Sequence, residues 1–207
     1  GLPFKSGQFV MLHIPQKDKP PIKRAYSLAS DERQPEEIKL IIKLVPGGVA
    51  SEYIKNLESG SPLELSGPFG KLLFREPPTA QVVFLCTGAG VSQHMSFLLS
   101  KCHAHPTIRF HMLFGVWNQD EIFYKSELEL VRKKLPLFNF EYVLDKSVGQ
   151  EWSGKIGYVT QYLEAFNYIE TATTFYLCGN PDMIKGVKAI LAEKNFPKER
   201  IFAEAFH

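Results

Sequence analysis

The stretch Arg24-Ala25-Tyr26-Ser27 puts a cation and an aromatic ring where they could bind one ligand together. Turn-forming residues flank it, which is typical of a short strand, and alternation places Arg24 and Tyr26 on one face. A guanidinium binds phosphate through two parallel hydrogen bonds, and a tyrosine ring offers a flat surface to another ring. By themselves the four residues fit an ordinary strand with a surface arginine better than a binding site.

A second candidate is the glycine pair in Gly47-Gly48-Val49-Ala50-Ser51, which leads into a helix predicted over residues 51–57 with Ser51 as N-cap. Free backbone N–H groups and the helix dipole at such a position attract anions. Most such pairs are only helix caps. Together with Arg24, however, this one could hold a pyrophosphate while Tyr26 covers a ring.

A third candidate, Thr87-Gly88-Ala89-Gly90, follows the apolar run at 82–86 and opens a helix. Glycine lets a backbone approach a phosphate closely at this kind of turn. The dinucleotide fingerprint is incomplete, because Gln93 stands where its third glycine would be. A tight turn without a ligand is an equally good interpretation.

The fourth candidate is Cys178-Gly179-Asn180-Pro181. Asn180 suits an N-cap and Pro181 the first helical position, so Cys178 would end a strand and face the same crevice as the third motif. The alternative is a small buried hydrophobic residue.

The remaining histidines and cysteines predict no metal site. The cluster Cys102-His103-Ala104-His105 lacks the second ligand group that zinc sites show. No Ser/His/Asp or Cys/His arrangement can be derived from the spacing.

Composition excludes several classes of function. The chain has 207 residues and a formal net charge of +2, with no basic run that would indicate nucleic acid. No apolar run reaches membrane-spanning length, and no signal peptide is visible. Three cysteines, an odd number, predict a reducing compartment, which we take to be the cytoplasm.

The order of predicted elements divides the chain in two. Short strands at 8–14, 24–29, 38–44 and 63–66, separated by proline and glycine turns, predict an antiparallel barrel domain over residues 1–78. The chain opens on a strand, so we expect this barrel to lack its first strand.

After Glu76-Pro77-Pro78 the pattern changes to alternating strands and helices, which predicts a parallel sheet in an α/β domain over residues 79–207. Ligands of such sheets bind at the carboxyl ends of the strands. The strands are predicted at 82–86, 108–116, 138–144, 174–178 and 201–205, and the helices at 92–102, 126–134, 159–166 and 181–194.

These four motifs, in this order on a barrel followed by a parallel sheet, resemble the ferredoxin–NADP reductase superfamily over essentially the whole chain. The resemblance implies an FAD-dependent NAD(P)H oxidoreductase, with the flavin on the barrel and the nicotinamide nucleotide on the α/β domain. Two departures are that Gln93 stands where proline is common, and that Phe206 replaces a tyrosine and loses its hydroxyl.

Carried over by position, the resemblance puts Arg24 at the flavin pyrophosphate, Tyr26 against the isoalloxazine and Ser27 near flavin N5. The backbone of Ile42, Lys43 and Leu44 would contact the flavin, and its phosphates would lie on Gly48, Val49, Ala50 and Ser51. On the nucleotide side, the pyrophosphate would lie on Thr87, Gly88 and Gly90, and the nicotinamide near Cys178, Gly179 and Met183.

The resemblance also assigns roles to the end of the chain. Glu204 would relay a proton or contact nicotinamide, and Phe206 would cover the flavin until nicotinamide displaces it. With Ser27 and Cys178 these form the implied catalytic set. The implied reaction is hydride transfer between nicotinamide C4 and flavin N5, followed by electron delivery to a protein acceptor: a ferredoxin, a flavodoxin or an oxygenase component.

The choice of nucleotide depends on Asp145-Lys146, which ends the third predicted strand of the sheet. A carboxylate favours the free ribose diol of NADH, whereas a lysine could accept the 2′-phosphate of NADPH. We expect NADH.

Three other functions stay open at this point. The chain could be an electron-transfer or regulatory subunit of a larger complex, a reductase of freely diffusing flavin, or a globular domain whose sites have decayed.

Overall fold

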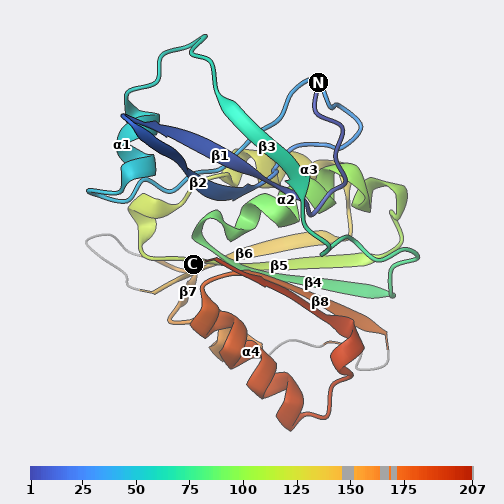
Figure 1. Cartoon of the computed structure of the whole chain (residues 1–207). Helices are drawn as coiled ribbons and strands as arrows, with labels where there is room; N and C mark the ends of the chain where they lie inside the picture. The colour runs from blue at the N-terminus through green and yellow to red at the C-terminus, as the bar shows by residue number, and fades with distance from the viewer. Residues whose placement is uncertain (146–151, 164–167, 169–171, 207) are drawn as a thin grey trace.

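The computed structural model describes residues 1–145, 152–163, 168 and 172–206. Two sheets form its framework: an antiparallel sheet of three strands and a parallel sheet of six. The antiparallel sheet lies above the parallel one in Figure 1, with helix α2 (Val91–Ser100) between them. The predicted order, an antiparallel unit followed by a parallel α/β unit, is confirmed. The boundary at residue 78 stays a prediction.

The antiparallel sheet consists of β1 (Phe9–Gln16), β2 (Lys19–Ser27) and β3 (Glu64–Phe69), in the order β2-β1-β3. Every second side chain of β1 is buried, and Val10 packs with Phe4 and Leu28. A half-buried strand shows this alternation because successive side chains point to opposite faces.

The strand predicted at 38–44 is wrong. Only one bridge forms there, between Leu28 and Leu40. The segment has no clean alternation, because Leu40 packs into the core of the N-terminal part while the next residue, Ile41, packs against the core of the parallel sheet. Its apolar residues therefore bridge the two parts.

Helix α1 (Val49–Lys55) begins two residues earlier than predicted. Its N-cap is Gly48, not Ser51, and no side chain caps it. The Ser51 hydroxyl instead accepts a hydrogen bond of 2.7 Å from the Val45 N–H, which closes the preceding loop.

The parallel sheet has the order β7-β6-β5-β4-β8-β9. Its strands are β4 (Gln81–Thr87), β5 (Arg109–Val116), β6 (Phe138–Leu144), β7 (Lys155–Ile156), β8 (Thr173–Gly179) and β9 (Ile201–Ala205). The chain moves outward from β4 to β7 and then returns to the other side of β4 at β8. Such a reversal opens a crevice at the carboxyl ends of the two central strands.

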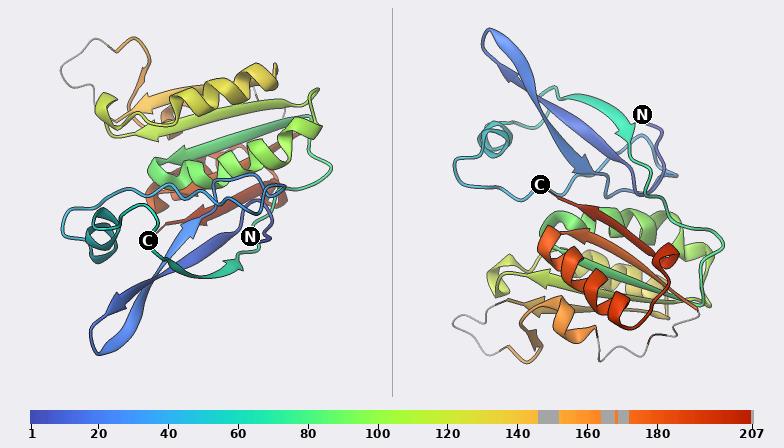
Figure 2. Two further views of the ribbon diagram at one scale, coloured as in Figure 1. Left: turned by 90° about the horizontal axis from the view of Figure 1, so that it is seen from above. Right: turned by 60° about the horizontal axis from the view of Figure 1, so that its bottom comes forward.

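Helices cover both faces of this sheet (Figure 2). Helices α2 and α3 (Lys125–Lys134) pack on one face, and α4 (Pro181–Glu193) packs on the other. The helix predicted at 159–166 begins as a 3₁₀ turn, Val159–Tyr162, and Phe166 lies outside the described residues. Further 3₁₀ turns span Gly88–Gly90, Cys102–Ala104, Gln119–Glu121 and Lys198–Arg200.

One face of α2 holds the two parts of the molecule together. Residues three and four apart on a helix share a face, so Gln93, Ser96 and Ser100 point the same way. Three hydrogen bonds cross from this face: Gln93 Nε2 to Gly7 O (3.4 Å), Ser96 Oγ to Ser30 O (2.8 Å) and Glu32 N to Ser100 Oγ (2.9 Å). Lys101 adds an ion pair with Glu32 at 2.6 Å. We call this set of contacts the seam.

His94 is a buried polar residue with no hydrogen-bond partner for either ring nitrogen in the described part of the chain. Its ring packs against Phe84 and Phe97. Burial lowers the pKa of His94 to about 3, so the ring is neutral. An unpartnered buried polar group costs stability that an apolar side chain of similar size would not.

We therefore predict that His94→Met leaves the free energy of unfolding at pH 7 unchanged or raises it by about 1 kcal/mol. Wild type should also lose stability below pH 6.5, because the unfolded chain binds a proton there that the folded chain does not. At pH 5 this loss amounts to about 2 kcal/mol and is absent from the variant.

Urea unfolding at pH 7 and pH 5 measures both effects. A variant destabilised at pH 7 by more than 1 kcal/mol would show that the imidazole has a stabilising partner.

Candidate functional site

A cleft of about 750 Å³ lies at the carboxyl ends of β4 and β8, where the strand order reverses. The turn after β4, the end of β5, the turn after β8 and the first turns of α4 form its walls. Among the residues that line it are Thr87, Gly88, Ala89, Trp117, Asp145, Tyr158, Gly179, Asn180, Asp182, Met183 and Phe206, with Lys43 from the N-terminal part. The predicted residues Lys43, Thr87, Gly88, Asp145, Gly179, Met183 and Phe206 are thus brought together.

Two glycines let the walls of this cleft meet. A Cβ on Gly90 would lie 2.2 Å from the Cys178 carbonyl oxygen, so the turn after β4 can rest on the end of β8 only without a side chain there. Gly179 has φ of +129°, and a Cβ on it would lie 2.4 Å from Thr87 Oγ1. The Thr87 oxygen accepts a hydrogen bond of 2.9 Å from the Asn180 N–H. Gly90 therefore serves packing, while Gly88 faces open space.

The start of α4 matches its prediction. Asn180 is the N-cap, and its side chain accepts a hydrogen bond of 2.7 Å from the Asp182 N–H, with Pro181 at the first helical position. Cys178 itself is fully buried beneath the cleft. Burial, together with the nearby Glu204 carboxylate, raises the pKa of its thiol well above the usual range. The thiol is therefore protonated and does not act as a thiolate.

Ser27, at the end of β2, meets Glu204, on β9, across the two parts of the molecule. The Ser27 hydroxyl donates a hydrogen bond of 3.5 Å to Glu204 Oε1. Glu204 is the sheet partner of Cys178, so these three of the four implied catalytic residues lie at one place. Burial raises the pKa of the Glu204 carboxyl, and hydrogen bonds from Ser27 and Gln93 partly offset this. A carboxyl in this environment holds its proton at higher pH than an exposed glutamate does.

Phe206 follows β9, and a backbone hydrogen bond holds it in place. Its N–H donates a hydrogen bond of 2.9 Å to the Gly179 carbonyl, and its side chain lines the cleft. The end of the chain thus lies between the two parts, as the right view in Figure 2 shows.

Arg24 and Tyr26 lie on the outer strand β2, opposite Leu12 and Val10 of β1, so they share one face as predicted. Arg24 is exposed, and no carboxylate pairs with it in the described residues. Burial raises the pKa of Tyr26, and the charge of Arg24 partly lowers it. An unpaired cation beside a half-buried ring fits a flavin with its phosphates.

The sequence predicted only a backbone contact for Lys43, whereas the structure also gives its side chain a partner. Its side chain crosses to the cleft and forms an ion pair of 2.8 Å with Glu121. The two side chains are 58% and 40% exposed, so the pair is weak and easily exchanged for another partner. Ile42 and Leu44 flank it outside any strand, and their backbone contacts with a flavin stay predictions.

Trp117 and Tyr158 line the cleft but were not predicted from the sequence. They remain 49% and 63% exposed, so part of each ring is accessible to a ligand in the cleft. Trp117 directly follows β5, so the rule that ligands bind at the carboxyl ends of strands could have found it. Tyr158 gave no such signal, because the short strand β7 before it was not recognised.

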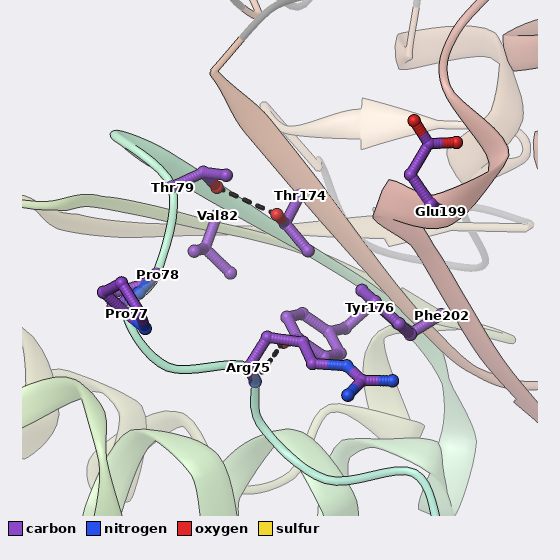
Figure 3. Close-up of a pocket in the computed structure, with 9 residues that line it drawn as sticks. All are labelled: Arg75, Pro77, Pro78, Thr79, Val82, Thr174, Tyr176, Glu199 and Phe202. Atoms are coloured by element: carbon purple, nitrogen blue, oxygen red, sulfur yellow. Dashed lines mark hydrogen bonds between the residues drawn. The ribbon is translucent and has the colours of Figure 1, made fainter.

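A second pocket, of about 360 Å³, lies at the opposite ends of the strands (Figure 3). Its polar groups already bind one another: Thr79 Oγ1 donates to Thr174 Oγ1 at 2.9 Å, and the Arg75 N–H donates to Tyr176 Oη at 2.8 Å. The Arg75 guanidinium lies 4.9 Å from the centre of the Phe202 ring. These contacts attach the connecting segment to the sheet, and none of them aims at a ligand.

The described residues contain neither a membrane-spanning helix nor a metal-binding cluster. No helix there is long and apolar enough to cross a bilayer. No group of three or more histidine, cysteine, aspartate or glutamate side chains there could hold a metal ion. In the Cys102–His105 cluster, His103 contacts Arg33 and His105 contacts Glu76.

The sequence matches two family profiles. Residues 1–74 match the oxidoreductase FAD-binding domain, and residues 84–189 match the oxidoreductase NAD-binding domain. The chain is 31% identical to ferredoxin–NADP reductase B of Sorangium cellulosum, with 98% of this chain and 85% of that protein covered. The chain belongs to the ferredoxin–NADP reductase superfamily. The resemblance drawn from its four motifs is thereby confirmed.

Other members of the superfamily are longer than this chain. The reductase component of phenol 2-monooxygenase from Pseudomonas sp. (strain CF600) is 31% identical over 100% of this chain but only 58% of its own length. The chain spans about three fifths of several such relatives. Among solved structures, the Amycolatopsis cytochrome P450 reductase GcoB shares the fold with a TM-score of 0.87 at 23% identity, covering 98% of this chain and 61% of that one.

The turn after β4 contains two glycines, Gly88 and Gly90, whose substitution by alanine gives a matched pair of variants. Gly90→Ala should destabilise the fold by about 3 kcal/mol, because its Cβ would collide with backbone. Gly88→Ala should cost only about 1 kcal/mol, since open space surrounds it and the cost comes from its φ of +51°.

Chemical denaturation of both variants measures the difference. Equal losses of stability would show that the turn after β4 is not packed against β8 as described.

Proposed function

We propose that this chain is an FAD-dependent NAD(P)H oxidoreductase that delivers electrons to an acceptor protein. The observation that carries the proposal is the contact between Ser27 of the flavin-binding part and Glu204 of the nucleotide-binding part, 3.5 Å apart beside the cleft. Bound FAD would take a hydride from the nicotinamide nucleotide and release its electrons one at a time. The residues of the chain bind and orient the two cofactors and control protons and water around them.

On the flavin side, Arg24 would bind the pyrophosphate and Tyr26 would cover the isoalloxazine. The exposed guanidinium and the half-buried ring beside it support this assignment. Ser27 would hydrogen-bond to the reactive edge of the ring. The phosphates would lie near Gly48, Val49, Ala50 and Ser51, and the backbone of residues 42–44 would meet the ring system.

On the nucleotide side, the turn formed by Thr87, Gly88 and Gly90 would receive the pyrophosphate, as switch-point turns do in other nucleotide-binding sheets. Gly179 and Met183 would contact the nicotinamide half, with Cys178 supporting them from below. Phe206 lines this end of the cleft and would have to move aside for the nicotinamide ring.

Trp117 and Tyr158 support an assignment for the other half of the dinucleotide. Both are exposed aromatic side chains that line the cleft together with Asp145. Stacking between rings would bind the adenine, and the Asp145 carboxylate would accept hydrogen bonds from the ribose hydroxyls.

The charges of the cleft favour NADH over NADPH. Glu121, Asp145 and Asp182 line it, while Lys43 is the lysine among the described lining residues and already pairs with Glu121. A 2′-phosphate would meet mostly like charge there. Lys146, the other residue considered for this phosphate, lies outside the described residues.

The acceptor is proposed from the relatives. Several are named as reductase or electron-transfer components of oxygenases, and one as a ferredoxin–NADP reductase. We propose an acceptor of the same kind: an oxygenase component, a ferredoxin or a flavodoxin. The three thiols are free and buried, which fits the reducing cytoplasm.

An absorption spectrum of the purified protein, followed by anaerobic titration with NADH and then NADPH, tests the function. We expect a stoichiometric flavin spectrum that bleaches on addition of nucleotide. Arg24→Ala and Tyr26→Ala should each weaken FAD binding about tenfold or more, consistent with loss of a charged hydrogen bond or of ring stacking.

Flavin that exchanges freely with solvent would favour a reductase of free flavin. A protein that binds no flavin, or whose flavin never bleaches, would contradict the proposal.

Asp145→Ser tests the choice of nucleotide. Removing the carboxylate should raise the NADPH-to-NADH ratio of kcat/KM by roughly tenfold, about 1.4 kcal/mol of relieved repulsion. Asp182→Ser is the matched control, since it removes the same charge from the first turn of α4 and should change the ratio much less. An unchanged ratio for Asp145→Ser, or equal changes in both variants, would rule out a contact between Asp145 and the ribose.

A further inference from the structure

One ion pair in the cleft joins the two parts of the molecule. Nζ of Lys43, from the N-terminal part, lies 2.8 Å from Oε2 of Glu121, which ends the 3₁₀ turn after β5. Both side chains line the cleft. Lys43 is the only cation among the described residues that line it, whereas Glu121, Asp145 and Asp182 all bring carboxylates. An anion that enters this cleft therefore meets a lysine that already has a partner.

Other contacts hold the backbone on both sides of the pair. The Asn118 side chain accepts a hydrogen bond of 3.2 Å from the Glu121 N–H, and the next residue, Ile122, packs against the core of the parallel sheet. On the other side, Ile41 packs against the same core two residues before Lys43. The two charged side chains themselves are 58% and 40% exposed. An exchange of partners therefore requires only rotation of these two side chains.

The chemistry of the cleft identifies the competing anion as the diphosphate of a nucleotide. Trp117 and Tyr158 offer exposed rings on the same walls, which suit a base. A lysine ammonium is a point-charge partner for phosphate, and a diphosphate presents two negative charges to it. The exposed pair with Glu121 is weak by comparison, because water solvates both ions.

We propose that Glu121 is an internal competitor of the nucleotide: it holds the Lys43 ammonium in the nucleotide-free molecule and loses it when the diphosphate enters. The pair then acts as a latch, which lowers the affinity of the cleft for reduced and oxidised nucleotide alike and so limits retention of the product. The proposal rests on the proposed function for the identity of the ligand. The ion pair itself exists without either cofactor.

The size of the effect follows from the strength of exposed ion pairs, which corresponds to a factor of roughly 1.5 to 5 in an equilibrium constant. Glu121→Gln keeps the shape of the side chain and removes its charge. Release of Lys43 in this variant should strengthen nucleotide binding by about threefold. Removing a negative charge from the cleft also relieves general repulsion, so a single variant does not isolate the latch.

A double-mutant cycle isolates it. The probe is ADP-ribose, which carries the adenine and the diphosphate but no nicotinamide, and NMR titration of the purified protein gives its Kd. Glu121→Gln should strengthen binding about threefold more in the wild-type background than in the Lys43→Met background. With Glu121→Gln already present, Lys43→Met should weaken binding by about tenfold, because a charged contact with phosphate is lost.

Asp182→Asn is the matched control. It removes a carboxylate that lines the same cleft but has no ion-pair partner among the described residues. Any gain in affinity from this variant is general relief of repulsion, so the gain should be the same with Lys43 and with Lys43→Met.

Equal effects of Glu121→Gln in the two backgrounds would overturn the proposal. So would a Lys43-dependent gain of the same size in Asp182→Asn, or a wild-type chain that binds no ADP-ribose. The probe cannot exchange a hydride, so the outcome separates from that of the proposed function. A chain that bleaches with NADH but shows no coupling loses only the latch, and a chain that shows the coupling but binds no flavin loses only the proposed function.

Discussion

The polar face of helix α2 is the contact on which the rest of the structure depends. Gln93, Ser96 and Ser100 hydrogen-bond to backbone groups at Gly7, Ser30 and Glu32 and so fix the antiparallel sheet on the parallel one. A hydrogen bond between neutral groups contributes only about 1 kcal/mol net, but three on one rigid helix define an orientation. Apolar residues such as Ile41 add area without the same directionality.

That orientation creates the site. Neither part contains the whole of the proposed catalytic set, because Ser27 belongs to the antiparallel sheet while Cys178 and Glu204 belong to the parallel one. They meet only because the end of β2 faces the ends of β8 and β9. The cleft beside them depends in turn on the strand reversal between β4 and β8 and on glycines that let the turns pack closely. Chemistry at this site is therefore a property of the assembled halves.

Much of this arrangement could be predicted from the sequence, because its signals are local. The buried run of β4 showed a strand covered on both faces, and Asn180-Pro181 marked the start of α4 through capping chemistry. The prediction failed where tertiary packing decides. Residues 38–44 are apolar enough for a strand, yet their side chains connect two cores instead. Ser51 suits an N-cap by type, but the loop before the helix uses its hydroxyl.

The sequence predicted the backbone elements around the cleft better than the side chains that line it. Turns such as Thr87–Gly90 have sequence patterns, whereas the cleft positions of Trp117 and Tyr158 follow from the packing of distant segments. The reach of Lys43 to Glu121 also crosses between the two parts, so no spacing within the sequence could reveal it. In the sequence, the glutamine at position 93 stood out only as a departure from a glycine pattern and from a position where proline is common.

A rigid seam has one consequence that can be measured directly. If the two parts are held in one orientation, the nicotinamide ring can present only one of its faces to the flavin. NADH carrying deuterium on one face of C4 should then lose all of its label on oxidation by the FAD-loaded protein, and NADH labelled on the other face should keep all of it, as mass spectrometry of the product would show. A mixture of labelled and unlabelled product from either substrate would contradict the fixed geometry described for this protein.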